Sequence, residues 1–92
     1  MMLEIKFSNQ MKRDFRRQIK RGKNPALLEK VLDLLANHIP LEKKHKDHDL
    51  TGDWIGYREC HIENDWLLVY KINEKELVLF ATRTGSHADF GW

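Results

Sequence analysis

The stretch that decides the fold is WIGYRECHIENDWLLVYKINEKELVLFATR, residues 54–83. It contains three runs rich in β-branched, aromatic and aliphatic residues, at 54–62, 66–72 and 76–83. Short polar segments at 63–65 and 73–75 separate these runs and are typical of turns. The stretch therefore predicts three consecutive strands joined as antiparallel hairpins.

The residues before this stretch predict a strand and a helix. Apolar residues first alternate with polar ones, as expected of a strand, at Leu3, Ile5 and Phe7. They then recur every four residues, as on one side of an amphipathic helix, at Met11, Phe15 and Ile19. Ser8 or Asn9 is the expected N-cap of this helix, and Gly22 is expected to follow its end.

A second helix is expected from the cap and first-turn pair Asn24-Pro25 to the stop at Pro40. Its leucines form a wide apolar side, whereas residues 41–53 are polar and predict a loop. The resulting order, β-α-α-β-β-β, predicts an α+β fold in which a helical hairpin packs on a twisted antiparallel sheet. We expect one domain over residues 1–92.

Composition excludes several classes of protein. An apolar fraction of 41% suits a globular chain, and no run approaches the length that crosses a bilayer, so no membrane association is expected. The N-terminus MMLEIKFSNQ lacks a signal-peptide core. The single cysteine, Cys60, excludes an internal disulfide and favours a reducing compartment, so we expect a cytoplasmic protein.

Charge is unevenly distributed, although the net charge is only +2. Residues 12–23 contain one acid, Asp14, and seven basic residues: Lys12, Arg13, Arg16, Arg17, Lys20, Arg21 and Lys23. Most of them fall outside the apolar stripe of the first helix. They predict a cationic surface for a polyanion, although a solvated helix surface explains them equally well.

The expected topology brings polar residues together at one end of the sheet. In a meander, the second strand ends where the third begins, and the fourth ends at the same edge. His61, Asp65, Arg83 and His87 are therefore expected to converge there. Two histidines, a carboxylate and an arginine make a candidate acid–base site.

A metal site is the alternative to consider, because His45 and His48 precede the second strand. No second ligand pair follows them at a metal-binding spacing, and Cys60 should face away from His61. We therefore expect neither a metal nor another cofactor. The loop leads His48 to the far end of the second strand, although about six extended residues can carry it part of the way back.

The segments 47–72 (DHDLTGDWIGYRECHIENDWLLVYKI) and 83–90 (RTGSHADF) closely resemble the YafQ branch of the RelE-like bacterial toxins. The shared motifs cover the second half of the chain, and the order of elements extends the resemblance to nearly the whole length. It implies the toxin of a type II toxin–antitoxin pair, which cuts messenger RNA in the ribosomal A site without a metal. It also implies a set of site residues here: His48, His61, Asp65, Arg83 and His87.

The chain departs from the family pattern at two places. Asn64 stands where the family usually has proline, which removes the fixed φ of proline from the turn. The tail ends His87-Ala88-Asp89-Phe90-Gly91-Trp92, so either Phe90 or Trp92 is expected to stack on an RNA base.

The resemblance and the residue types together predict a mechanism. We expect His87 to be the general acid and Arg83 to hold the scissile phosphate. Two hypotheses remain for the base: His61 oriented by Asp65, or Asp65 assisted by His48. The basic residues of the first helix are expected to contact ribosomal RNA: Lys12, Arg13, Arg16, Arg17 and Lys20.

The expected partners are the 70S ribosome with its messenger RNA and an acidic, partly disordered antitoxin. Operator DNA is expected to be bound only through that antitoxin, since this chain shows no recognition helix. Two alternatives are a ParE-like toxin that inhibits DNA gyrase by binding alone and a plain RNA-binding module. Neither uses the histidines for chemistry.

Overall fold

The computed structural model describes all 92 residues and confirms the predicted meander. Its three antiparallel strands are β3 (Arg58–Glu63), β4 (Trp66–Asn73) and β5 (Val78–Gly85). Strand β3 begins at Arg58, four residues later than expected, because Gly56 has a φ of 94° in a turn that precedes the strand. The turn between β3 and β4 is closed without the family's proline, since the Asn64 carbonyl accepts the N–H of Trp66 at 2.9 Å.

Two further strands extend the meander into a sheet of order β1-β5-β4-β3-β2. β1 (Glu4–Phe7) pairs with β5 in parallel, so the sheet is not wholly antiparallel. The short β2 (His48–Asp49) pairs with β3 and lies in the segment that was predicted to be loop. The α+β class is confirmed, with this one additional strand.

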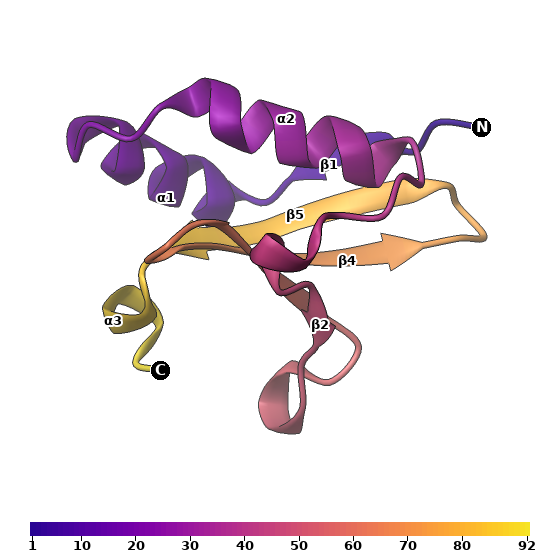
Figure 1. Ribbon diagram of the computed structural model, residues 1–92. Coiled ribbons are helices and arrows are strands. Elements are labelled where there is room, and N and C mark those ends of the chain that lie inside the picture. The colour runs from indigo at the N-terminus through magenta and orange to yellow at the C-terminus, as the bar shows by residue number, and fades with distance from the viewer.

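The two expected helices, α1 (Asn9–Lys20) and α2 (Pro25–Ala36), lie on the same side of the sheet (Figure 1). The Ser8 side chain caps α1 and Asn24 caps α2. The second helix ends at Ala36, well before Pro40. Neither helix is long and apolar enough to cross a membrane.

The predicted apolar stripe of α1 is only partly confirmed, since Met11 and Phe15 pack on the core but Ile19 does not. Met11 is buried, but Ile19 is 39% exposed and Phe15 is only half-buried. The other buried positions of the helix are polar, Asp14 and Gln18. The reason is tertiary: this side of α1 faces the end of β5, where a backbone N–H and an arginine require an acceptor.

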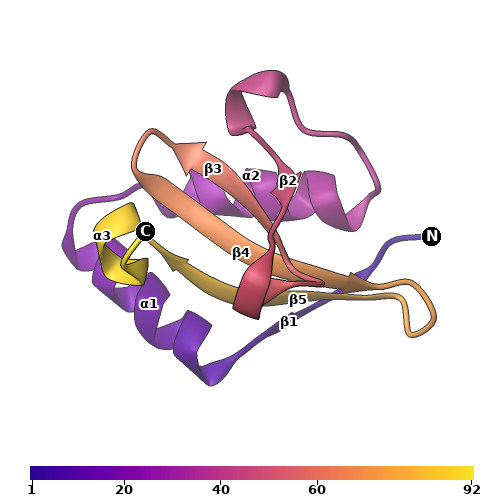
Figure 2. The same cartoon turned by 90° about the horizontal axis from the view of Figure 1, so that it is seen from below.

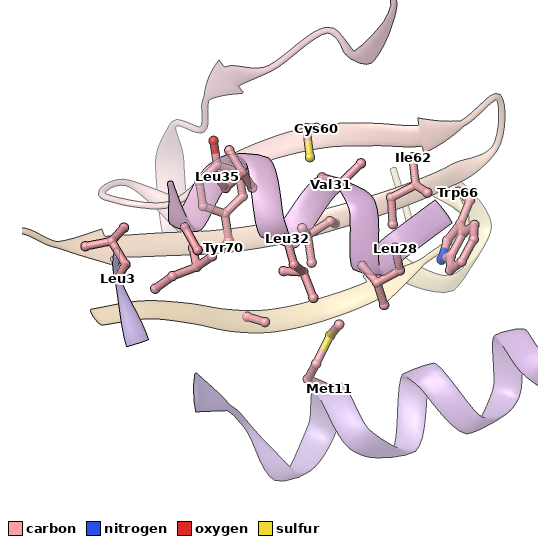
Figure 3. Close-up of a cluster of buried hydrophobic side chains, with 14 residues drawn as sticks. Leu3, Met11, Leu28, Val31, Leu32, Leu35, Cys60, Ile62, Trp66 and Tyr70 are labelled. Atoms are coloured by element: carbon pink, nitrogen blue, oxygen red, sulfur yellow. The ribbon is translucent and has the colours of Figure 1, made fainter. Parts of the chain in front are cut away.

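The main core lies between α2 and the sheet (Figure 3). Leucines and a valine of α2 pack against Cys60, Ile62, Trp66 and Tyr70 of the strands. Cys60 is fully buried there, and burial strongly raises the pKa of its thiol. Its neighbour His61 therefore faces the opposite side of the sheet, as strand alternation predicts.

The opposite side carries short elements that the sequence did not predict (Figures 1 and 2). They are η2 (Gly52–Trp54) and α3 (His87–Phe90), whereas the edge strand β2 and the preceding η1 (Lys43–His45) lie along the β3 edge of the sheet. Leu67 and Val69 of β4 are fully buried although they are not part of the main core cluster. The side of the sheet that carries His61 is thus partly covered by these short elements.

Candidate active site

Three neighbouring strands bring the predicted residues to one end of the sheet. His61 of β3 pairs with Leu67 of β4, and Leu67 pairs with Gly85 at the end of β5. The chain then turns into α3, whose first residue is His87. The rings of His61 and His87 lie 5.5 Å apart between centroids, with their planes 62° apart. The predicted convergence of the two histidines is therefore present.

His87 is held by Asp65. The Asp65 carboxylate accepts the backbone N–H of His87 at 3.0 Å and lies 2.7 Å from its Nδ1. These hydrogen bonds, first the backbone one and then the side-chain one, lower the pKa of Asp65. An ionised Asp65 places the ring proton on Nδ1, which leaves Nε2 of His87 free to exchange a proton with a substrate. Asp65 thus lies with His87 and not with His61, contrary to one hypothesis for the base.

Glu59 is the residue that sequence reasoning missed. It lies two positions before His61 on β3, on the same side of the strand, and is almost fully buried. Its Oε1 lies 3.6 Å from Nε2 of His61 and 3.8 Å from Nε2 of His48. The signal in the sequence was its spacing of two residues from His61, which places both side chains on the same side of a strand.

We refer to His48, His61 and His87 as the histidine cluster. His48 reaches this cluster through β2. It pairs with Glu59 across the β2–β3 ladder, so the additional strand carries it back along the sheet. Its Nδ1 lies 2.7 Å from the Lys46 carbonyl, which can only accept, so this nitrogen carries a proton. The structure therefore groups His48 with Glu59 and His61, whereas no hydrogen bond or ion pair joins it to Asp65.

The environment of His61 lowers its pKa. Burial is the main cause, and the positive charges of Lys46, His87 and His48 act in the same direction. Glu59 opposes them. The lowered pKa favours a neutral imidazole at pH 7, which is the form that a general base requires.

A second set of contacts fastens the segment that bears His48. The Tyr70 hydroxyl donates to Asp47 at 2.6 Å, and Arg58 contacts Asp47 at 3.4 Å and Asp49 at 2.6 Å. Three residues before His48, at the end of η1, Nδ1 of His45 donates to the His61 carbonyl at 2.6 Å. Burial, followed by the hydrogen bond to Asp47, raises the pKa of Tyr70, so its hydroxyl stays protonated as a donor.

Arg83 lies near the end of β5 and is already paired. Its Nε and Nη2 donate to the buried Asp14 of α1 at 2.9 and 3.2 Å, and Thr84 N–H donates to the same carboxylate. Burial alone would raise the pKa of Asp14, but these hydrogen bonds outweigh burial and lower it. The Phe90 ring lies 4.9 Å from the guanidinium carbon of Arg83. The arginine is therefore held in place, with Nη1 not used by Asp14.

The C-terminal turn is also fixed. Ser86 and Asp89 form a capping box at the start of α3, and Arg21, the C-cap residue of α1, forms a bidentate ion pair with Asp89 at 2.6 and 2.9 Å. The hydrogen bond from Arg21 is the main reason why the pKa of Asp89 is strongly lowered. The two expected stacking residues lie together at this turn, since the Trp92 backbone N–H donates to the His87 carbonyl at 2.9 Å and the Trp92 ring lies 4.9 Å from that of Phe90.

The basic residues of α1 behave as the sequence predicted, in that all five are exposed: Lys12, Arg13, Arg16, Arg17 and Lys20. None forms a hydrogen bond or an ion pair with the histidine cluster. No group of three or more histidine, cysteine, aspartate or glutamate side chains has a geometry that could hold a metal ion.

A family model described as the bacterial toxin of type II toxin–antitoxin system, YafQ, matches residues 3–91. This chain belongs to the YafQ toxin family. It is 42% identical over 86 residues to the mRNA interferase toxin YafQ of Escherichia coli, which covers 92% of this chain and 91% of that protein.

Solved toxin structures share nearly the whole fold. The toxin in the crystal structure of the E. coli DinJ–YafQ toxin–antitoxin complex superposes with a TM-score of 0.86 at 40% identity, covering 97% of each chain. A metal-bound toxin from Helicobacter pylori superposes with a TM-score of 0.90 at 43% identity, covering 96% of this chain and 98% of that one. The α+β fold expected from the resemblance is therefore confirmed.

Proposed function

We propose that this chain is an mRNA interferase, the toxin of a type II toxin–antitoxin pair, which cuts messenger RNA in the ribosomal A site by metal-free acid–base catalysis. One observation carries the proposal: the rings of His61 and His87 lie 5.5 Å apart, and each lies beside a different carboxylate, Glu59 for His61 and Asp65 for His87. Two titratable pairs with different environments are what acid–base catalysis requires. The E. coli relative is itself named an mRNA interferase.

The chemistry follows from the two pairs. His61, whose pKa is lowered, removes the proton from the RNA 2′-hydroxyl, and the oxygen attacks the adjacent phosphorus. The bond from phosphorus to the 5′-oxygen breaks as Nε2 of His87 gives that oxygen a proton. The products are a 2′,3′-cyclic phosphate and a 5′-hydroxyl, and the proton balance is restored by exchange with water.

The neighbouring groups support these two steps. Asp65 stabilises the protonated form of His87 and orients its ring. Glu59 with His48 orients His61 from the other side. Arg83, whose Nη1 is not used by Asp14, is the proposed donor to the scissile phosphate, where negative charge develops.

The exposed basic side of α1 is suited to phosphate contacts with ribosomal RNA. The cluster itself offers few groups that read bases, so the ribosome is proposed to position the substrate. This activity places the protein in the cytoplasm. A gyrase-binding role, the alternative, gives no function to the paired histidines.

The experiment is cleavage of a defined message during translation in a purified system. His87→Ala and His61→Ala are expected to lower the rate roughly 10²-fold each, the usual contribution of one acid–base group. Circular dichroism must show that both variants remain folded. Efficient, site-specific cutting of the same message without ribosomes would overturn the ribosome-dependent part of the proposal.

The proposed partner is an acidic, partly disordered antitoxin that binds α1 and the free edge of β1. A groove of about 630 Å³ between α1 and α2 is lined by apolar residues, including Phe15 and Leu28. Its charged lining residues are two bases, Lys12 and Arg16, and one acid, Glu29. An amphipathic segment with acidic flanks is complementary to such a groove. In E. coli, the relative forms a complex with DinJ. Operator DNA is proposed to be bound through the antitoxin alone.

Co-expression with the neighbouring reading frame tests this partner. We expect a stable complex in a pull-down and restored growth. Arg16→Glu should weaken the complex. Lys43→Glu should not, because Lys43 is an exposed residue of η1 that does not line the groove. Equal growth arrest with and without the neighbour, together with no recovered complex, would exclude that frame as the antitoxin.

A further inference from the structure

Four aromatic rings form a continuous row on the side of the sheet away from α1 and α2. The row starts at Phe90 in α3, continues through Trp92 and Trp54 of η2, and ends at Tyr57. Its successive centroid distances are 4.9, 6.1 and 5.3 Å. The row joins the C-terminal tail to the loop before β3, two segments that lie close together in Figure 2. We refer to these four residues as the aromatic row.

A cation lies at each end of the aromatic row. At the α3 end, the Arg83 guanidinium lies 4.9 Å from the Phe90 ring. At the other end, Nζ of Lys71 lies 5.5 Å from the Tyr57 ring. Both distances are within the range of a cation–π contact. The row is thus bounded by positive charge, and at the α3 end it adjoins the helix that begins with His87.

A pocket continues the aromatic row beyond Tyr57. It measures about 640 Å³ and is lined by both Tyr57 and Lys71. Cross-strand pairing places Lys6, Phe80 and Lys71 side by side on β1, β5 and β4. The lining contains these two lysines and one acid, Glu76, which already accepts from Asn73. The pocket therefore offers net positive charge beside an aromatic floor.

The rings of the row are ordered without being core. Trp92 is 44% exposed and the other three rings are half-buried, whereas the third tryptophan of the chain, Trp66, is fully buried in the main core. Edge-to-face contacts hold Trp54 at nearly 90° to both Tyr57 and Trp92. Rings that are fixed before binding lose little conformational entropy when a ligand stacks on them.

We propose that the aromatic row and the adjoining pocket bind single-stranded RNA, and that they hold nucleotides outside the one at which the chain is cut. Single-stranded nucleic acid is bound by aromatic stacking platforms combined with nearby cations that contact phosphates. The row meets both conditions and leads away from the histidine cluster. This proposal rests on the proposed function, in which the ligand is messenger RNA.

Intrinsic fluorescence gives a direct test, because two of the three tryptophans lie in the row and the third is buried. The probe is a short unstructured RNA with 2′-O-methyl groups throughout, which lacks the nucleophile and stays intact. We expect it to quench the fluorescence of Trp54 and Trp92. Trp92→Ala, at the last residue, should weaken binding roughly tenfold, as the loss of one stacked base does. Trp54→Leu should weaken it to a similar extent.

Charge variants provide the matched comparison. Lys71→Gln should weaken binding and lower the slope of log affinity against log salt by about one. Lys30→Gln, on the exposed side of α2, should change neither quantity. If Trp92→Ala and Lys71→Gln bind the probe as the unaltered protein does, the proposal is wrong. Quenching by a purified partner protein but not by the RNA would also overturn it.

Cleavage of a translated message by the same variants separates this proposal from the proposed function. His87→Ala should still bind the intact probe, although it no longer cuts. A protein that binds the probe through Trp92 yet cuts no message would overturn the nuclease function and support the RNA-binding row. A protein that cuts normally while Trp92→Ala and Lys71→Gln bind the probe unchanged would overturn the row alone.

Discussion

The Asp65 carboxylate accepts the backbone N–H of His87 at 3.0 Å and lies 2.7 Å from its ring Nδ1. One carboxylate thus fixes both the start of α3 and the tautomer of the histidine that α3 carries. The pair has the geometry by which a carboxylate stabilises an imidazolium.

Replacing Asp65 with asparagine should lower the cleavage rate at least tenfold, because the amide keeps an acceptor but removes the charge that stabilises protonated His87. The measurement is single-turnover cleavage of a translated message. Asp53→Asn, an exposed aspartate in η2, is the matched control and should cut normally. An unchanged rate for Asp65→Asn would remove Asp65 from the mechanism.

The pKa of His61 should be measurable by NMR titration and should lie below its usual value of about 6.5. As a general base, His61 must be neutral, so the rising limb of the pH–rate profile should follow that lowered pKa. Glu59 raises the pKa of His61, whereas Lys46 lowers it. Glu59→Gln should therefore move the limb to lower pH, and Lys46→Gln should move it to higher pH. Shifts in the reverse directions would contradict the assignment.

Asp14→Ala should destabilise the fold by about 1–3 kcal/mol, because it leaves the Thr84 N–H and Arg83 without their acceptor. The pKa of Asp14 is lowered in the folded state, so this contribution is present above its ordinary pKa of about 3.8. It is lost as pH falls through the lower folded-state value. Urea unfolding at pH 7 and below pH 3 measures the difference.

Arg17→Ala is the comparison for that experiment. Arg17 also contacts Asp14, at 3.5 Å, but its side chain is exposed. Its removal should cost less than about 1 kcal/mol, because the contact of a solvent-exposed arginine is screened by water even though Asp14 is buried. Equal losses for Arg17→Ala and Asp14→Ala would show that burial of the carboxylate is not the cause.

Asp47→Ala should release the segment 41–50 from the sheet, since it removes the acceptor for both Tyr70 and Arg58. Trypsin should then cut faster after Lys43, Lys44 and Lys46, and cleavage of messenger RNA should fall because His48 loses its position. Asp49→Ala removes an exposed partner of Arg58 and should change the trypsin rate little. Identical proteolysis of the two variants would contradict the proposed role of Asp47.

Removal of metal should leave the activity unchanged. Protein treated with EDTA and then freed of chelator by gel filtration is expected to cut a translated message at the original rate, with magnesium supplied for the ribosomes. The solved H. pylori relative is a metal-bound toxin, so metal analysis of the purified protein is the necessary companion measurement. Stoichiometric zinc or copper whose removal stops cleavage would overturn metal-free catalysis.

Local sequence patterns were sufficient for most of the fold. The meander, α2 and the caps at Ser8 and Asn24 follow from periodicity and turn chemistry, which act between residues close in sequence. The convergence of His61 with His87 also followed, because a meander admits few arrangements of its strand ends.

Only the tertiary structure decided which groups are paired. The sequence determined that histidines and carboxylates meet at one end of the sheet. It did not determine that Asp65 holds His87, that Glu59 lies between His48 and His61, or that Asp14 is buried against Arg83. Except for Glu59 and His61, which are two residues apart on β3, these pairs join residues 11, 22 and 69 positions apart. Whether a hydrogen bond forms depends on differences of a few tenths of an ångström in the donor–acceptor distance. No periodicity in the sequence carries that information.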